Sequence, residues 1–286
     1  MSLFFLLLME QYYFLFGIAI VWIVFAIIQD LKTTEVSNWL NYSLIVFVLA
    51  YRAFYAINVR EIMFFVYGLI GILMFVAFGY LFYYGRIFAG GDAKLLMGLG
   101  GILPFESVRD YLFLGGGFIF LLFIAGLLWS LIYSLTIVYK RKESFINGFK
   151  EVWRKNRKWL AIIIVFALIL ELISFNNSLL FRGFILLSFV ILFLLYVYAR
   201  ALDRGCMDIL KDYRKLQEGD WLINDVRVRG RWVRKSVHGL SKEDIKKLQK
   251  AKKKVWIKEG IPFTPAFLIS LIVFICFWFK GFFSLI

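Results

Sequence analysis

The chain has 286 residues, of which 62% are hydrophobic and 20% aromatic, and its mean hydropathy is +0.79. This composition excludes an ordinary water-soluble domain and predicts a polytopic membrane protein. The net charge of +15 would suggest nucleic-acid binding in a soluble protein. In a membrane protein it favours contact with anionic lipid instead, so we expect lipid and no nucleic acid as a partner.

Apolar runs near the length of about 20 residues that a helix needs to cross a bilayer predict about eight spans, one of them short. Only three prolines and few strand signals occur, which favours helices over a barrel. The expected spans cover residues 10–29, 38–57, 62–84, 92–103 (the short one), 111–138, 159–175, 179–199 and 263–285.

Polar segments divide the chain into four expected parts. These are a transmembrane core (1–138), a basic loop with an extra helical hairpin (139–199), a basic cytoplasmic subdomain (200–262) and a final transmembrane helix (263–286). In the third part, residues 218–236 alternate polar and apolar side chains, which predicts a hairpin of short strands. Residues 241–254 predict a basic helix with Ser241 as its N-cap. The predicted fold class is an all-α polytopic membrane protein with a small α+β subdomain.

The distribution of Lys and Arg predicts the orientation of the chain. With the N-terminus outside, 29 of the 34 basic residues fall in inside segments, which are 30–37, 85–94, 139–158 and 200–262. Basic residues concentrate on the cytoplasmic side of membrane proteins. This topology requires the short span to cross the membrane, and it places both chain ends outside.

Two aspartates reach the same cytoplasmic edge in this topology. Asp30 ends the first apolar run, and Asp92 follows Gly90 and Gly91 at the start of the short span. A carboxylate at the edge of hydrocarbon is costly, so it suggests a functional site. Each residue also has a plainer interpretation, because Asp30 could begin a loop and Asp92 could cap a helix.

A pair of carboxylates can hydrolyse an amide bond without a nucleophilic side chain. Two carboxylates that lie close together share one proton, because both cannot ionise easily. The ionised group takes a proton from water, and the protonated group donates toward the carbonyl oxygen. Gly90 and Gly91 lack side chains, so they would let a substrate backbone approach Asp92.

The two aspartate motifs resemble those of the type IV prepilin peptidases, which are GxGD aspartyl proteases. The first motif reads Asp-Leu-Lys-Thr-Thr-Glu-Val-Ser-Asn over 30–38, and the second reads Gly-Gly-Asp-Ala-Lys-Leu over 90–95. The archaeal branch, which includes the preflagellin peptidases, is the best match. The chain departs from the pattern at Ala89, where the family has the first glycine of GxGD.

The resemblance implies a multi-pass membrane endopeptidase that uses neither metal nor cofactor. Such enzymes remove a short basic leader from archaellin or type IV pilin-like precursors at the cytoplasmic face. Carried over by position, Asp30 and Asp92 are the catalytic pair. Pro265-Ala266-Phe267 is also similar to the Pro-Ala-Leu of presenilin-type proteases, although the segment 260–265 is explained more simply as a rigid start to the last span.

Three polar residues near the motifs are candidate accessory residues. Lys94 could steady the charge of the aspartate pair or reach lipid headgroups. Glu35 could meet the basic leader of a substrate or stay a solvated loop residue. Asn38 could form a hydrogen bond near the pair or cap the second span.

Two other functions are open on the sequence alone. A cation-coupled transporter could bind its ion with Asp30 and Asp92, although both acids lie at one interface rather than at the midplane. A noncatalytic membrane scaffold of a secretion system would also account for the large basic segments.

Overall fold

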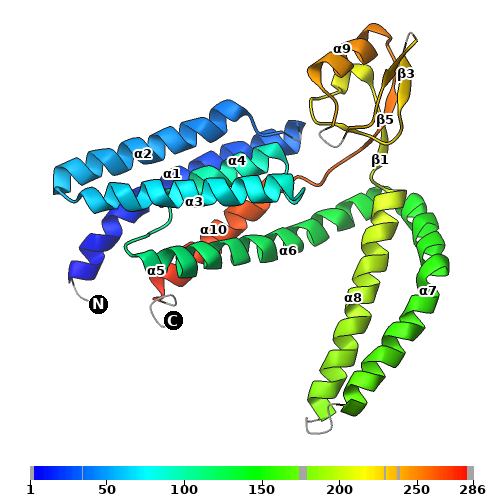
Figure 1. Cartoon of the computed structure of the whole chain (residues 1–286), viewed down its shortest axis with the longest axis horizontal. Helices are drawn as coiled ribbons and strands as arrows, with labels where there is room; N and C mark the ends of the chain where they lie inside the picture. Colours follow the sequence, from blue (N-terminus) through cyan, green and yellow to red (C-terminus); the bar gives the residue numbers. More distant parts are fainter. Residues whose placement is uncertain (1–2, 34, 174–178, 229, 237–238, 282–286) are drawn as a thin grey trace. The chain divides into compact units, whose positions relative to one another are not determined.

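The computed structural model describes residues 3–33, 35–173, 179–228, 230–236 and 239–281, and most of them are helical (Figure 1). The chain divides into two compact units. The first consists of Met1–Ile132 and Pro262–Ile286, and the second of Tyr133–Ile261.

The first unit is a bundle of helices. Its elements are α1 (Leu3–Thr33), α2 (Asn38–Val59), α3 (Ile62–Tyr84), α4 (Gly90–Leu99), the one-turn α5 (Val108–Asp110), the π-helical turn η1 (Tyr111–Gly115), most of α6 (Gly116–Lys140) and α10 (Thr264–Phe279). Helices α2, α3 and α4 lie side by side, and α1 packs on α2 and α10 (Figure 1). Large apolar side chains such as Phe25, Val46 and Leu73 are exposed on these helices, as expected where lipid replaces water.

Four helical stretches of the described chain are long and apolar enough to cross a membrane. They are Gln11–Thr33, Asn38–Val59, Ile62–Tyr84 and Val108–Lys140, and α10 is a shorter apolar helix. These helices fit a membrane protein, but they do not confirm eight spans. The fourth expected span contains only the ten residues of α4. The spans expected at 159–175 and 179–199 include residues whose side chains the structure does not describe.

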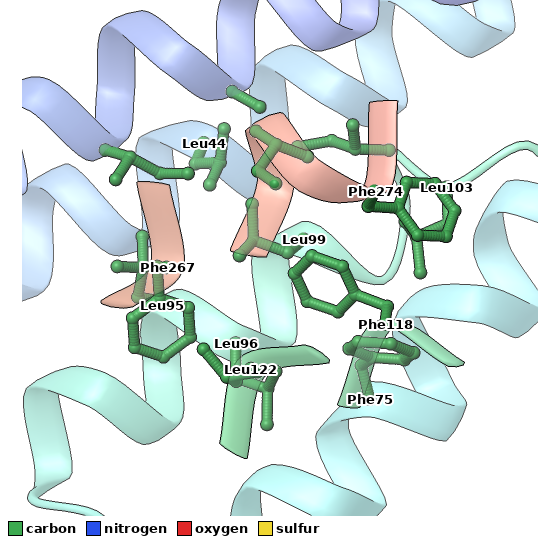
Figure 2. Close-up of a cluster of buried hydrophobic side chains, with 14 of the residues drawn as sticks. Leu44, Phe75, Leu95, Leu96, Leu99, Leu103, Phe118, Leu122, Phe267 and Phe274 are labelled. Atoms are coloured by element: carbon green, nitrogen blue, oxygen red, sulfur yellow. The ribbon is translucent and has the colours of Figure 1, made fainter. Parts of the chain in front are cut away.

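Helix α4 forms the centre of the first unit. Its Leu95, Leu96 and Leu99 are buried on several sides of the helix, which is typical of a helix enclosed by others. Figure 2 shows the surrounding side chains, which include Leu44 of α2, Phe75 of α3, Phe118 and Leu122 of α6, and Phe267 and Phe274 of α10.

Glycines allow α3 to approach α4 with backbone against backbone. A Cβ atom added at Gly71 would collide with the carbonyl oxygen of Gly100, and one added at Gly100 would collide with that of Gly71. Small residues permit this close contact between helices in a membrane, where packing rather than hydrophobic burial drives association.

A buried arginine forms hydrogen bonds to the segment in which α4 ends. After Leu99 the chain continues as a buried turn and loop over 100–105. Arg52 of α2 is fully buried, and it donates hydrogen bonds to the carbonyl oxygens of Gly101 (2.6 Å), Phe64 (2.6 Å) and Leu103 (2.9 Å). Irregular backbone at membrane depth is tolerated only where its polar groups are satisfied within the protein. Arg52 therefore stabilises the irregular segment that directly follows the short helix α4.

The second unit begins with a helical hairpin formed by α7 (Lys142–Ile173) and α8 (Leu179–Gly205). The prediction of a basic loop at 139–158 is wrong, because the residues from Lys142 onward form the first half of α7. This half is amphipathic rather than loop-like. Phe149, Val152 and Trp153 pack with Phe193 and Val197 of α8, while the charged side chains lie on other faces.

A small α+β subdomain follows the hairpin. Its elements are β1 (Asp208–Lys211), the 3-10 turn η2 (Tyr213–Lys215), β2 (Trp221–Leu222), β3 (Val226–Val228), β4 (Arg231–Val233), α9 (Lys242–Lys250) and β5 (Val255–Lys258). The antiparallel pair β3–β4 confirms a hairpin within 218–236, but β2 pairs with β5 in a separate sheet of order β1-β5-β2. The helix expected over 241–254 is confirmed at its start, where the Ser241 hydroxyl accepts a hydrogen bond from the Asp244 amide, but it ends at Lys250.

Candidate active site

Asp30 lies near the C-terminal end of α1, and only 6% of it is exposed. Its Oδ2 accepts two hydrogen bonds from Thr264, one from the backbone N–H (3.2 Å) and one from the hydroxyl (2.8 Å). Thr264 is the first residue of α10 and is itself fully buried. The first N–H groups of a helix have no partner within the helix, so they suit a carboxylate.

Asp92 is the third residue of α4 and is 9% exposed. Its carboxylate accepts a hydrogen bond from the backbone of Ala89, which is the N-cap residue of that helix. An acidic residue at the third helical position often reaches back in this way. Asp92 therefore stabilises the start of α4. It is not the N-cap residue that the alternative interpretation expected, because Ala89 holds that position.

The structure brings the two aspartates together. The Asp30 and Asp92 carboxylates interact electrostatically, and both side chains are buried. Two negative charges close together in a poorly solvated site repel each other, so one of the two groups keeps a proton more readily. The end of α1 and the start of α4 thus place two buried carboxyl groups where they interact.

The two glycines before Asp92 differ in their surroundings. A Cβ at Gly91 would lie 3.3 Å from both the Cβ and the backbone nitrogen of Val36, whereas a Cβ at Gly90 would make only an ordinary contact, 3.6 Å from Tyr83. The side-chain amide of Asn41 also donates a hydrogen bond to the Gly91 carbonyl oxygen (3.2 Å). Gly91 thus lets the segment after Asp30 pack against α4. Substrate approach over the two glycines stays a prediction.

Lys94 and Asn38 contact each other. The Lys94 ammonium donates to the Asn38 side-chain oxygen (2.6 Å) and lies 5.9 Å from the centre of the Tyr42 ring. This contact joins α4 to α2. Asn38 is the first residue of α2 rather than its cap, because Ser37 holds the N-cap position. Glu35 is exposed, and its backbone carbonyl accepts a hydrogen bond from the Thr33 hydroxyl.

Sequence reasoning missed Thr264 and Gln29. The Gln29 side-chain oxygen accepts a hydrogen bond from the Ser37 amide (3.0 Å), which ties the segment after Asp30 back onto α1. Thr264 could have been noticed as a hydroxyl residue directly before Pro265 at the start of an apolar run, where proline often marks the first turn of a helix. Its pairing with Asp30 joins residues 234 positions apart, and no local pattern contains that information.

A long apolar helix that ends near Asp30 and a short enclosed helix that begins near Asp92 define a class of membrane protein with a mostly buried acidic site. Residues 17–135, which include both aspartates, match the model of the Type IV leader peptidase family. This match covers less than half of the chain, and it supports the resemblance to this family that the two motifs predicted.

One similar protein is named a preflagellin peptidase and comes from Methanocaldococcus jannaschii. It is 26% identical over 89 residues, which make up 31% of this chain and 38% of the relative. The chain thus aligns with well under half of that relative's length. No solved structure matches the chain.

Proposed function

We propose that this chain is a membrane aspartyl endopeptidase that removes the leader peptide from archaellin or type IV pilin-like precursors. The observation that carries the proposal is the convergence of Asp30 and Asp92, two buried and electrostatically coupled carboxyl groups. They come from separate motifs of the stretch that matches a peptidase family. The name of the relative, preflagellin peptidase, supports the choice of substrate class.

The hydrogen bonds around the two acids support different roles for them. Asp30 accepts two hydrogen bonds from Thr264 through one oxygen, whereas Asp92 accepts one from the backbone of Ala89. Hydrogen bonds donated to a carboxylate favour its ionised form. We therefore assign Asp30 as the base that accepts a proton from water and Asp92 as the proton donor.

The reaction follows from this assignment. Asp30 takes a proton from a water molecule, and the water oxygen bonds to the carbonyl carbon of the scissile peptide while Asp92 gives its proton to the carbonyl oxygen. The tetrahedral intermediate then breaks its C–N bond. The leaving nitrogen receives the proton held by Asp30, and Asp92 recovers its proton from the hydroxyl group that becomes the new carbonyl.

The expected membrane topology suits such a substrate. Both aspartates are proposed to lie at the cytoplasmic face, with the two chain ends outside. A precursor whose basic leader precedes an apolar helix would place its cleavage site at the same level of the membrane. Glu35 is exposed in the segment between the first two spans, so it is a proposed contact for the basic leader.

A cleavage assay tests the function. The full chain is reconstituted in lipid vesicles with a preflagellin-type precursor, and release of the leader is followed by mass spectrometry. We expect cleavage by the wild-type protein and none by Asp30→Asn or Asp92→Asn. The matched control is Asp212→Asn in the second unit, where an asparagine oxygen can still accept the hydrogen bond from the Arg214 amide.

Two outcomes would contradict the proposal. Cleavage that persists in either asparagine variant would remove that carboxyl group from the mechanism. Ion flux across the vesicle membrane that depends on both acids, without any cleavage, would favour the cation-coupled transporter.

A further inference from the structure

The three-stranded sheet of the second unit has one face in a core and one face exposed. Leu222 and Ile257 are buried in the apolar cluster that also contains Ile245 and Leu248 of α9. Successive side chains of a strand point to opposite faces. The neighbours Trp221, Trp256 and, on β1, Leu210 therefore point away from this core, and they are 48%, 52% and 51% exposed.

These three side chains lie on the same face of the sheet as Lys258, and we call this surface the tryptophan face. Leu210 of β1 is the direct cross-strand partner of Trp256 on β5. Trp221 of β2 pairs with Lys258, which lies two residues beyond Trp256 on the same face. Diagonal neighbours at this spacing are within reach of aromatic side chains. Since the core lies on the other side of the sheet, the tryptophan face contributes little to holding the subdomain together.

Positive charge lies beside Trp256 of the tryptophan face, in a subdomain where basic residues outnumber acidic ones. Residues 208–258 contain sixteen Lys and Arg against seven Asp and Glu. Next to Trp256, the side chains of Arg227, Lys253 and Lys254 line a hollow of about 190 Å³. Asp225 lines the same hollow, and one of its carboxylate oxygens accepts a hydrogen bond from the Lys235 amide. The balance of charge at the hollow is thus positive.

We propose that the tryptophan face binds the surface of an anionic lipid bilayer. Tryptophan is enriched at the boundary between water and hydrocarbon, and clustered Lys and Arg side chains bind anionic headgroups. Stable attachment to a membrane surface generally takes two such signals, and the face supplies both. Four helices in the described part of the chain are able to cross a membrane, so every copy is itself held at a bilayer. The last point favours lipid over nucleic acid as the occupant.

Spin labels on the full chain test the proposal. In a background of Cys206→Ala and Cys276→Ser, one label is attached at Leu210→Cys in the tryptophan face. A second is attached at Gln249→Cys, an exposed position of α9, the helix packed on the other face of the sheet. The protein is reconstituted in vesicles of phosphatidylcholine, with or without phosphatidylglycerol, and collisions with oxygen and with a water-soluble nickel complex are measured.

We expect phosphatidylglycerol to raise the oxygen collisions of the label at 210 severalfold and to lower its nickel collisions. The label at 249 should stay accessible to nickel in both lipids. Equal nickel access of the label at 210 in both kinds of vesicle would overturn the proposal. Protection of that label by an added oligonucleotide, but not by anionic lipid, would also overturn it.

Charge reversals separate the tryptophan face from overall charge. The double variant Lys253→Glu with Lys254→Glu should abolish the lipid response of the label at 210. The matched control, Lys246→Glu with Lys250→Glu on α9, changes the net charge equally and should keep the response. An unchanged spectrum of the label at 249 shows that the subdomain is still folded. Equal loss in both double variants would contradict a specific face.

Discussion

Among the described residues of the first unit, ionisable side chains are buried at two sites, and comparing these sites distinguishes a structural role from a chemical one. Arg52 is fully buried, and three backbone carbonyls accept its hydrogen bonds. Asp30 and Asp92 are also buried, but each has a second negative group as its neighbour. A buried charge whose hydrogen-bond partners are all present stabilises the fold. Two neighbouring carboxyl groups instead favour a state in which one of them holds a proton that it can donate. Burial of an ionisable group is therefore a weaker sign of function than the character of its partners.

Removing one member of the carboxyl pair should have the largest effect on activity. Asp92→Asn should lower cleavage by at least about a hundredfold, because it removes a proton donor. The same variant should leave the thermal unfolding temperature in detergent unchanged, since the asparagine oxygen can still accept the hydrogen bond from the Ala89 backbone. Leader release and unfolding are measured on one preparation. A variant that loses stability together with activity would place Asp92 in the same structural role as Arg52.

Replacing the buried arginine should have the opposite profile. Arg52→Met leaves three carbonyl groups without their donor, so the free energy of unfolding should fall by roughly 3 kcal/mol or more. Arg52→Lys should recover only part of the loss, because one ammonium cannot reproduce the planar set of donors. Chemical unfolding in detergent checks both variants, and the exposed Arg109→Met is the control. If Arg52→Met were as stable as the wild-type protein, the structural role of Arg52 would be contradicted.

Thr264 links the acid pair to α10, and its hydroxyl should affect the rate of cleavage. Thr264→Val removes one of the two hydrogen bonds that Asp30 accepts, so the carboxylate is held less firmly and kcat should fall severalfold with KM unchanged. Thr264→Ser keeps the hydroxyl and should restore the wild-type rate. Ser270→Ala, which removes a buried hydroxyl on the same helix, is the control. A loss of folded protein that matches the loss of activity would show a purely structural role.

The smallest effect is expected at Lys94. Its hydrogen bond to Asn38 lies at the exposed edge of the site, so Lys94→Met should change stability by less than about 1 kcal/mol. Cleavage should keep its pH profile. A displaced profile would instead mean that the ammonium acts on the carboxyl pair, and would revive the accessory role considered for this residue.

The two aspartates could be predicted from the sequence because the pattern that marks each of them lies within a few neighbouring residues. Asp30 and Asp92 stand out by their position at the ends of apolar runs, and the distribution of basic residues predicted that they share one side of the membrane. The meeting of Asp30 with Thr264 depends on how α1 packs against α10, which no spacing in the chain encodes.

The wrong and missing predictions of secondary structure also have physical causes. The basic segment after Lys142 was expected to be a loop because of its charge. However, lysine, arginine and glutamate are good helix formers, and Phe145, Phe149 and Val152 recur at helical spacing. Strands β1 and β5 were not predicted, because each has only four residues and they pair across 44 to 50 positions of the chain. Such short strands are stabilised by their cross-strand partners rather than by their own sequence.

The hydrogen bonds between Asp30 and Thr264 have a consequence for biosynthesis. The two residues are 234 positions apart, so a ribosome has made the first helix long before it reaches the threonine. Until then the Asp30 carboxylate lacks both of the donors that hold it. The site can be completed only after α10 has been synthesised and inserted, which delays its assembly until long after α1 and α4 have been made.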